Sequence, residues 1–327
     1  MVWARSSGFD MSSSHKTILA VGFLVLMGAA SGLGSYPVYL MSLAMINVIA
    51  AVGLNMLTGN AGQISLCHSS FMAIGAYTST LISAHWGLPF WVSIPLGTAL
   101  AGLAGGLLGA PATRLAGIYL ALATLGFLQI VQITIEELSS ITGGVRGLNV
   151  PKASIAGTEL SDYPKFLIIG LSCAAVIWIC SNLMKSRVGR EFDAVRLSPH
   201  AAQAMGLSIS RIKLSAFMLS AALAGLAGGL QALLVGFIDP VEFGVSASLR
   251  HITFIVVGGM GSMGGSVLGA LVLSALPEFL RPVKEYSDLI YVAILLAFLI
   301  FLPRGLITLL TSLMNRVRGI GRAAGRT

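Results

Sequence analysis

The sequence predicts an all-α polytopic membrane protein with about ten transmembrane helices. Of its 327 residues, 56% are hydrophobic and only 10% are charged, whereas soluble domains have roughly 25% charged residues. The hydrophobic residues gather in runs close to the ~20 residues that a helix needs to cross a bilayer. Basic residues gather in a few intervals between these runs, as in cytoplasmic loops. We therefore assign the net charge of +8 to the membrane surface and expect no nucleic-acid partner.

Apolar runs fill a transmembrane domain, 17–303, between a polar N-terminal segment, 1–16, and a basic tail, 304–327. The first run follows Lys16 and also resembles a signal peptide. Because the second run begins almost at once, we expect a retained helix instead. The runs lie near 17–33, 37–57, 64–84, 90–110, 118–138, 164–184, 214–236, 252–259, 266–280 and 289–302.

The eighth run is short and ends in a glycine-rich segment. Gly259, Gly261 and Gly264 fit the GxGxxG pattern, but that pattern indicates a dinucleotide site only within alternating strands and helices. The flanking runs here are membrane-like. Irregular backbone is tolerated in a bilayer where it is packed in protein or lines a water-filled path. We therefore expect a broken or re-entrant segment around these glycines.

Charge alternates between the two sides of the predicted membrane domain. With ten spans and an inside N-terminus, Arg114, the loop 185–213 and the tail all lie inside. Because cytoplasmic loops carry an excess of Lys and Arg, both termini are predicted to be cytoplasmic. The acidic residues of the opposite side are Glu136, Glu137, Glu159, Asp162, Asp239, Glu242, Glu278, Glu285 and Asp288.

One segment, ALAGLAGGL, occurs twice, at 99–107 and at 222–230. In the predicted topology the two copies run in opposite directions, as in transporters built from inverted repeats. The simpler interpretation is that small residues at GxxxG spacing recur because they let helix backbones pack closely. We favour close packing and keep the inverted repeat as the alternative.

The basic loop 185–213 contains the signals of a short capped helix. Ser198 is a good N-cap, Pro199 suits the first helical position, and Gly206 suits the position after the end. These signals predict a helix from Pro199 to Met205, with a small apolar face made by Ala201, Ala202, Ala204 and Met205. A separately capped helix outside the bilayer indicates a docking site; the alternative is an ordinary basic loop.

The sequence contains no recognisable motif for nucleotide binding, catalysis or metal binding. It has no GxxxxGK[ST] loop for ATP phosphates, and no nucleophile lies beside a base in any recognisable pattern. Cys67, Cys173 and Cys180 lie in apolar runs without the companions of a metal site, so buried structural cysteines are expected. We therefore predict no enzyme activity, no metal site and no cofactor bound by this chain.

Polar residues within the apolar runs are the candidates for contact with a solute. Such groups are costly in a bilayer and usually face the protein interior or a wet cavity, although each can also hydrogen-bond a neighbouring helix. Acidic residues deep in the runs are scarce, which argues against a proton-driven carrier. The polar candidates are Asn55, Gln63, His68, Gln129, Gln132 and Glu136.

Four segments together carry a resemblance to a known family. They read GLNMLTGNAGQISLCHSSFMAIGAY at 53–77, ATLGFLQIV followed by ITGGVRGL at 123–148, the loop and helix VGREFDAVRLSPHAAQAMGLSISRIKLSAFMLSAALAGLAGGL at 188–230, and FIVVGGMGSMGGSVLGA at 254–270. These resemble the LivM-type permease subunits of ABC importers for branched-chain amino acids. Two positions depart from the family: Cys67 replaces a usual Gly, and SPHAAQ lacks the usual Glu before its Ala pair.

The resemblance implies a multi-subunit importer in a bacterial inner membrane. Its partners would be a LivH-like second permease, two cytoplasmic ATPases that bind ATP and Mg, and a periplasmic substrate-binding protein. The solute would be a branched-chain or other small amino acid, with urea or a short amide as the alternative. A stand-alone secondary carrier or channel is a further alternative. The implied ATPase-coupling residues are Arg190, Arg196, Ser198, Pro199, Ala201, Ala202, Met205 and Gly206, and the candidate path residues are Asn55, Gln63, His68, Gln129, Gly259 and Gly261.

Overall fold

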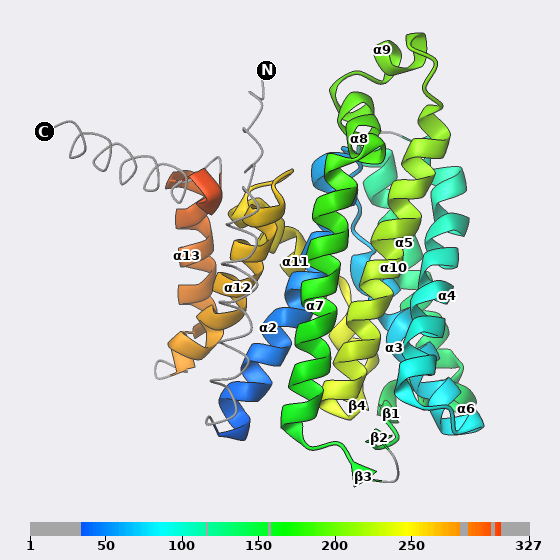
Figure 1. Cartoon of the computed structure of the whole chain (residues 1–327), viewed down its shortest axis with the longest axis vertical. Coiled ribbons are helices and arrows are strands. Elements are labelled where there is room, and N and C mark those ends of the chain that lie inside the picture. Colours follow the sequence, from blue (N-terminus) through cyan, green and yellow to red (C-terminus); the bar gives the residue numbers. More distant parts are fainter. Residues whose placement is uncertain (1–33, 116, 156–157, 282–286, 302–304, 309–327) are drawn as a thin grey trace, which may run out of the picture.

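The computed structural model describes residues 34–115, 117–155, 158–281, 287–301 and 305–308, and it is almost entirely helical. Short strands and 3₁₀ turns fill the connections (Figure 1). The helices are α2 (Ser35–Leu54), the π-helix η2 (Asn55–Asn60), α3 (His68–Trp86), α4 (Phe90–Ala112), α5 (Ile118–Glu137), α6 (Ser139–Thr142), η3 (Gly144–Arg146), α7 (Asp162–Lys185), α8 (Arg187–Leu197), α9 (Pro199–Ala204), α10 (Ile209–Val235), η4 (Pro240–Phe243), α11 (Val245–Gly258), α12 (Met263–Leu280) and α13 (Ser287–Phe301). The strands are β1 (Leu148–Asn149), β2 (Ser154–Ile155), β3 (Thr158–Glu159) and β4 (Phe237–Ile238).

Six helices in the described residues are long and apolar enough to cross a membrane: α2 with η2, α4, α5, α7, α10 and α12. The membrane class is thus confirmed, whereas the count of ten spans stays a prediction. The first predicted run, 17–33, lies outside the described residues. Three helix starts differ most from the predicted runs: α3 begins at His68 and not near 64, α10 at Ile209 and not near 214, and α11 at Val245 and not near 252. α11 has only 14 residues, or about 21 Å at 1.5 Å per residue.

The core of the bundle forms around α2, which lies between α7, α10, α11 and α12. Every residue from Val48 to Leu57 is buried. A helix that is apolar all round is either buried within protein or spans a membrane, and α2 with its buried residues does the first within the bundle. The π-helix η2 continues α2 to Asn60, and irregular backbone at 61–67 then leads into α3.

Glycines bring α3, α4 and α10 into backbone contact. A Cβ on Gly75 of α3 would lie 2.1 Å from the Gly225 oxygen of α10. A Cβ on Gly228 would meet the Met72 backbone in the same way. The two ALAGLAGGL copies face each other here, since a Cβ on Gly225 would lie 2.4 Å from Ala101 Cβ. Close packing therefore explains the repeated segment, and the inverted repeat stays untested.

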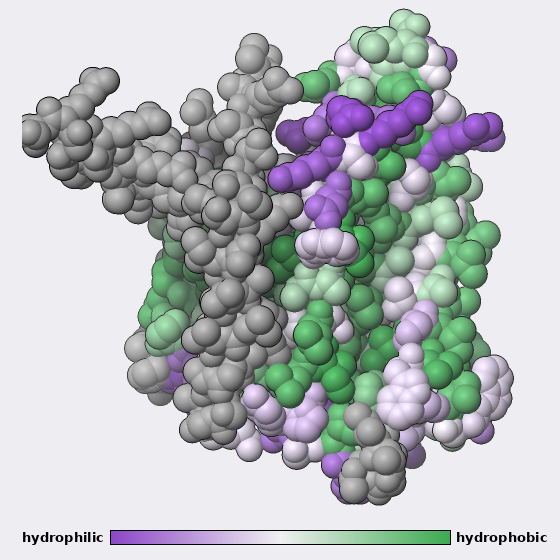
Figure 2. All heavy atoms as spheres, viewed as in Figure 1, coloured by the Kyte–Doolittle hydropathy of each residue, from purple (hydrophilic) through white to green (hydrophobic). Residues whose placement is uncertain are grey.

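The two ends of the bundle differ (Figure 1). One end carries α8 and α9. The opposite end carries the β2–β3 hairpin and the antiparallel β1–β4 pair, in which Leu148 pairs with Ile238. Figure 2 shows hydrophilic side chains gathered over the α8 end and hydrophobic ones along the flanks. This distribution is typical of a helical bundle that is embedded in lipid between two aqueous ends.

Candidate functional site

The capped helix predicted in the basic loop is present as α9, Pro199–Ala204. The Ser198 hydroxyl accepts a hydrogen bond from the Ala201 amide at 3.3 Å. Gly206 has a φ of +83°, the left-handed conformation that favours glycine. Met205 is the C-cap and not the last helical residue, so the predicted helix was one residue too long.

The apolar residues of this region do not share one face. Ala202 is 2% exposed and packs inside the chain, whereas Met205 is 82% exposed and Leu197 is 79% exposed. Ala201 and Ala204 are also exposed. Ala202 therefore anchors α9 to the bundle, and the side chains available to a partner are Leu197, Ala201, Ala204 and Met205.

A second helix of this loop, α8, was missed by the sequence analysis. The Ser186 hydroxyl caps it by accepting from the Val188 amide at 3.2 Å. Only Gly189, Phe192 and Val195 are buried, so a narrow stripe at a spacing of three residues holds α8 to the bundle. Because charged residues dominate the rest of the segment, the sequence analysis did not detect this buried stripe.

The two arginines assigned to coupling lie in different environments. Arg190 is exposed and donates to the Lys185 carbonyl at 3.3 Å. Arg196 is half-buried, and its Nη1 donates to the Gly59 carbonyl of η2. The structure therefore separates residues that the sequence placed in one group.

Asn55 and Gly261, predicted as path residues, lie next to Arg196. The Asn55 Oδ1 accepts a hydrogen bond from the Gly261 amide at 2.8 Å. The Asn60 side chain donates to the Gly261 carbonyl at 3.4 Å. Gly259 and Gly261 have φ values of +118° and +78°, so the backbone between α11 and α12 is irregular, while a re-entrant segment stays a prediction.

A pair of buried histidines forms the second polar cluster. His68 of α3 is 1% exposed and His251 of α11 is 5% exposed, and their ring centroids lie 5.7 Å apart. Ring nitrogens approach the Ala50 and Ala247 carbonyls, yet none of the four has a partner with hydrogen-bond geometry. Unpaired buried polar groups cost roughly 1–3 kcal/mol each, which makes this cluster a candidate for binding.

Two serine hydroxyls join the starts of α3 and α11 beside the histidines. The Ser69 and Ser248 hydroxyls are 2.7 Å apart, and Ser248 Oγ accepts from the Ser69 amide at 3.1 Å. Ser69 also donates to the Gly244 carbonyl, just before α11. The N-terminal ends of two helices, each with partial positive charge, therefore converge inside the bundle.

The remaining path candidates lie apart from this cluster. Gln63 is buried and donates to the Lys213 carbonyl at 3.2 Å, so it ties 61–67 to α10. Gln129 is exposed on α5 and faces away from the described bundle. His251, Ser69 and Ser248 were missed by sequence reasoning. His251 lies just before the predicted run 252–259 and next to Arg250, so it was not counted among the polar residues of the apolar runs.

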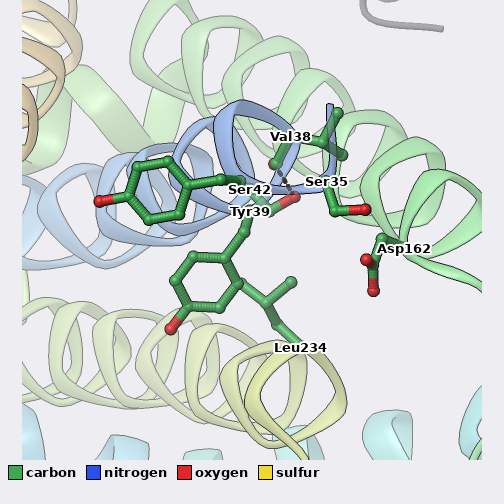
Figure 3. A pocket seen from close by; sticks show the side chains of 7 residues that line it. Ser35, Val38, Tyr39, Ser42, Asp162 and Leu234 are labelled. Carbon is green, nitrogen blue, oxygen red and sulfur yellow. Dashed lines mark hydrogen bonds between the residues drawn. The ribbon is translucent and has the colours of Figure 1, made fainter. Parts of the chain in front are cut away.

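An open cavity of about 310 Å³ lies at the opposite end of α2 (Figure 3). It is formed where the starts of α2 and α7 meet the end of α10. Ser42, the cavity residue nearest to the polar clusters along α2, precedes Asn55 by 13 residues, or about 20 Å of helix. The cavity is therefore separate from the clusters described above. Its lining residues are Ser35, Tyr36, Val38, Tyr39, Ser42, Asp162 and Leu234.

A bundle of apolar helices with polar clusters in its core and a capped helix on its basic end is the architecture of a polytopic helical membrane protein. The family model described as "Branched-chain amino acid transport system / permease component" matches residues 36–299, and the chain belongs to this family. The LivM permease protein of Escherichia coli K12 is 35% identical, over 91% of this chain and 76% of that protein.

Two further relatives fit the same family. The LivM permease protein of Salmonella typhimurium is 35% identical, over 81% of this chain and 68% of that protein. The LivH permease protein of Escherichia coli K12 is 26% identical, over 79% of this chain and 90% of that protein. No solved structure matches the chain. The chain therefore resembles both LivM and LivH proteins, and it is more similar to these LivM proteins.

Proposed function

We propose that this chain is the permease subunit of an ABC importer that carries branched-chain or other small amino acids inward. The observation that carries the proposal is α9, a helix capped by Ser198 at the basic end of a chain in this family. In the proposal, ATPase subunits dock on Leu197 and Met205, bind the ATP and Mg, and move α8 and α9. The chain itself contributes no catalytic group.

The proposed assembly contains a LivH-like second permease, two ATPases and a periplasmic binding protein in the bacterial inner membrane. α5 supports a second membrane chain, because it is the least buried of the six candidate spans. Gln129 is exposed on that helix, and a polar side chain within a span usually faces protein or water and not lipid. We propose that the partner permease covers this face of α5.

The proposed solute path passes the histidine pair. His68 and His251 offer unpaired ring nitrogens, and the starts of α3 and α11 add partial positive charge beside them. Interrupted membrane helices use such ends to hold anionic groups of a substrate, so this environment suits the carboxylate of an amino acid. Asn55 Nδ2 is also buried without a partner and would extend the polar lining.

The docking proposal is tested by Met205→Asp, with Val145→Asp as the control. Both side chains are apolar and exposed, and they lie in α9's C-cap and in η3 at the other end. A charge in a desolvated contact costs several kcal/mol, so we expect M205D to reduce co-purification of the ATPases at least about tenfold. V145D should retain them.

Uptake into vesicles completes the test. Solute uptake that persists after every ATPase is removed would contradict an ABC permease and favour a stand-alone carrier or channel. A thermal-shift screen of the cognate binding protein separates the solute classes. Stabilisation by leucine, isoleucine or valine supports amino-acid import, whereas stabilisation by urea or short amides alone contradicts it.

A further inference from the structure

Arg196 lies at the junction of the surface helices and the membrane core. It is in the last turn of α8, and its guanidinium points inward to the Gly59 carbonyl of η2. Its Cγ would lie 3.2 Å from a Cβ on Gly62. The side chain therefore runs along the inner end of the α2–η2 helix and is half-buried there.

The same guanidinium contacts the turn between α11 and α12. A Cβ on Gly261 would lie 2.7 Å from Arg196 Nη1. A Cβ on Gly59 would lie 2.5 Å from the Gly261 nitrogen, so these two glycines are in direct backbone contact. Asn55 and Asn60 hold Gly261 from the other side by hydrogen bonds. One arginine thus touches two membrane segments that are far apart in the sequence.

Electrostatics favour a cation at this position. η2 ends at Asn60 and α11 ends at Gly258, and C-terminal helix ends carry partial negative charge. Arg196 makes no ion pair within the described residues. Its planar group offers several donors in a fixed geometry, one of which donates to the Gly59 carbonyl at the end of η2.

We propose that Arg196 is a positioning residue of the transport cycle and not a docking contact for the ATPases. It links α8 and α9 to the inner ends of η2 and α11, so that a displacement of the surface helices moves both ends together. This rests on the proposed function, since the displacement comes from the ATPases.

The segments that Arg196 contacts lead to the proposed solute path at two points, Asn55 and His251. Asn55 accepts from Gly261 with its oxygen, while its nitrogen is buried without a partner. His251 lies seven residues before Gly258 on α11, or about two helical turns. A joint shift of these two ends relative to α3 therefore changes the distances from Asn55 and His251 to His68, the groups that we assign to the path.

The test compares Arg196→Gln, Arg196→Lys and the control Arg187→Gln in the complete complex of permeases and ATPases. Arg187 is on the same helix, is exposed and pairs only with Glu191 of that helix among the ion pairs of the described residues. Amide hydrogen exchange is followed at 56–62 and 259–262. Uptake and ATP hydrolysis are measured in liposomes with loaded binding protein.

We expect R196Q to keep the ATPases bound and to speed exchange in both segments. Solute moved per ATP should fall roughly tenfold, within the usual range of coupling between sites. R196K keeps the charge but loses the planar fork, so its effect should be intermediate. R187Q should match the wild type in exchange and in coupling.

Two results would overturn the proposal. Release of the ATPases by R196Q, without faster exchange at 259–262, would make Arg196 a docking contact. If R196Q moved as much solute per ATP as the wild type, the contacts of Arg196 would not transmit the displacement of α8 and α9. If R196Q does not fold, R196K provides the test. The proposal then requires faster amide hydrogen exchange at 259–262 in R196K while the ATPases remain bound. Failure of the proposed function itself looks different, since the wild-type complex would then bind no ATPase or move no solute.

Discussion

At the scale of single residues, the clearest functional signal is buried polarity without partners. Asn55, His68 and His251 each contain atoms that are buried and lack a hydrogen-bond partner. Most buried polar atoms in folded proteins do have one. A protein that retains such atoms in its core gives up stability, so they are expected to serve a ligand or water in another step of the cycle.

His251→Phe tests this interpretation. Phenylalanine keeps a planar ring and removes two unpaired nitrogens, so the melting temperature should stay the same or rise, because the penalty of roughly 1–3 kcal/mol disappears. Uptake should fall by about tenfold or more, as for a lost contact in the transport step. The control is Thr98→Val on α4, whose hydroxyl is also buried and unpaired.

Thr98→Val should leave uptake near the wild type and, for the same reason as H251F, leave the melting temperature unchanged or slightly raised. It removes an unpaired polar atom where α4 faces Gly225 of α10, away from the histidines. Wild-type uptake by H251F would show that the histidine pair serves packing alone.

At the scale of helices, backbone contact between α3, α4 and α10 fixes the bundle. A Cβ on Gly75 would approach the Gly225 backbone to 2.1 Å and 2.4 Å. Real Cβ atoms do not reach such distances, and neither helix can move without disturbing α4. Interfaces of small residues are a common way to join membrane helices, because dispersion forces act best at close range.

Gly75→Ala should destabilise the protein strongly, by about 1–3 kcal/mol for overpacking of a tight interface. The measurement is thermal unfolding in detergent. Gly126→Ala on α5 is the matched control, because a Cβ there meets nothing within 4 Å. In an exposed helical position alanine is favoured over glycine by about 1 kcal/mol. If both variants melted at one temperature, close contact between α3 and α10 would be refuted.

Local signals in the sequence predicted individual elements well. Ser198, Pro199 and Gly206 were sufficient for α9, because capping depends on neighbours in the chain. Apolar runs located α4, α5 and α7 within two residues at each end. α8 was not predicted, since its buried stripe has only three residues among many charges.

Contacts between distant segments could not be predicted in the same way. Arg196 and Gly59 are 137 positions apart, and Ser69 and Ser248 are 179 apart. Nothing near Arg196 in the sequence shows that it points inward, so it was grouped with Arg190. Only the packing of α8 against η2 distinguishes the two side chains.

At the scale of the whole molecule, the two ends differ in charge and in structure. The basic segment 185–213 contains α8 and α9 and forms one end, while the strands occupy the opposite end (Figure 1). By the excess of basic residues, the α9 end should be cytoplasmic. The predicted division into 1–16, 17–303 and 304–327 depends on this orientation.

Labelling with a membrane-impermeant maleimide checks the orientation. We expect a Met205→Cys variant to react only after the membrane is opened, and a Val145→Cys variant to react in intact spheroplasts. Both positions are highly exposed. The unmodified chain is the control, since Cys67, Cys173 and Cys180 are buried. Labelling of Met205→Cys in intact spheroplasts would reverse the orientation and remove the basis for cytoplasmic docking.

The glycine contacts of α3, α4 and α10 have a mechanical consequence. Where backbones touch directly, no intervening layer of side chains can change rotamer, so sliding one helix past another would break the interface. These three helices should therefore travel as a single stiff body throughout the transport cycle. The helices that move relative to one another are then those around this body. A ligand that restricts α2 or α11 would therefore inhibit transport, whereas one that binds α4 would leave transport unchanged.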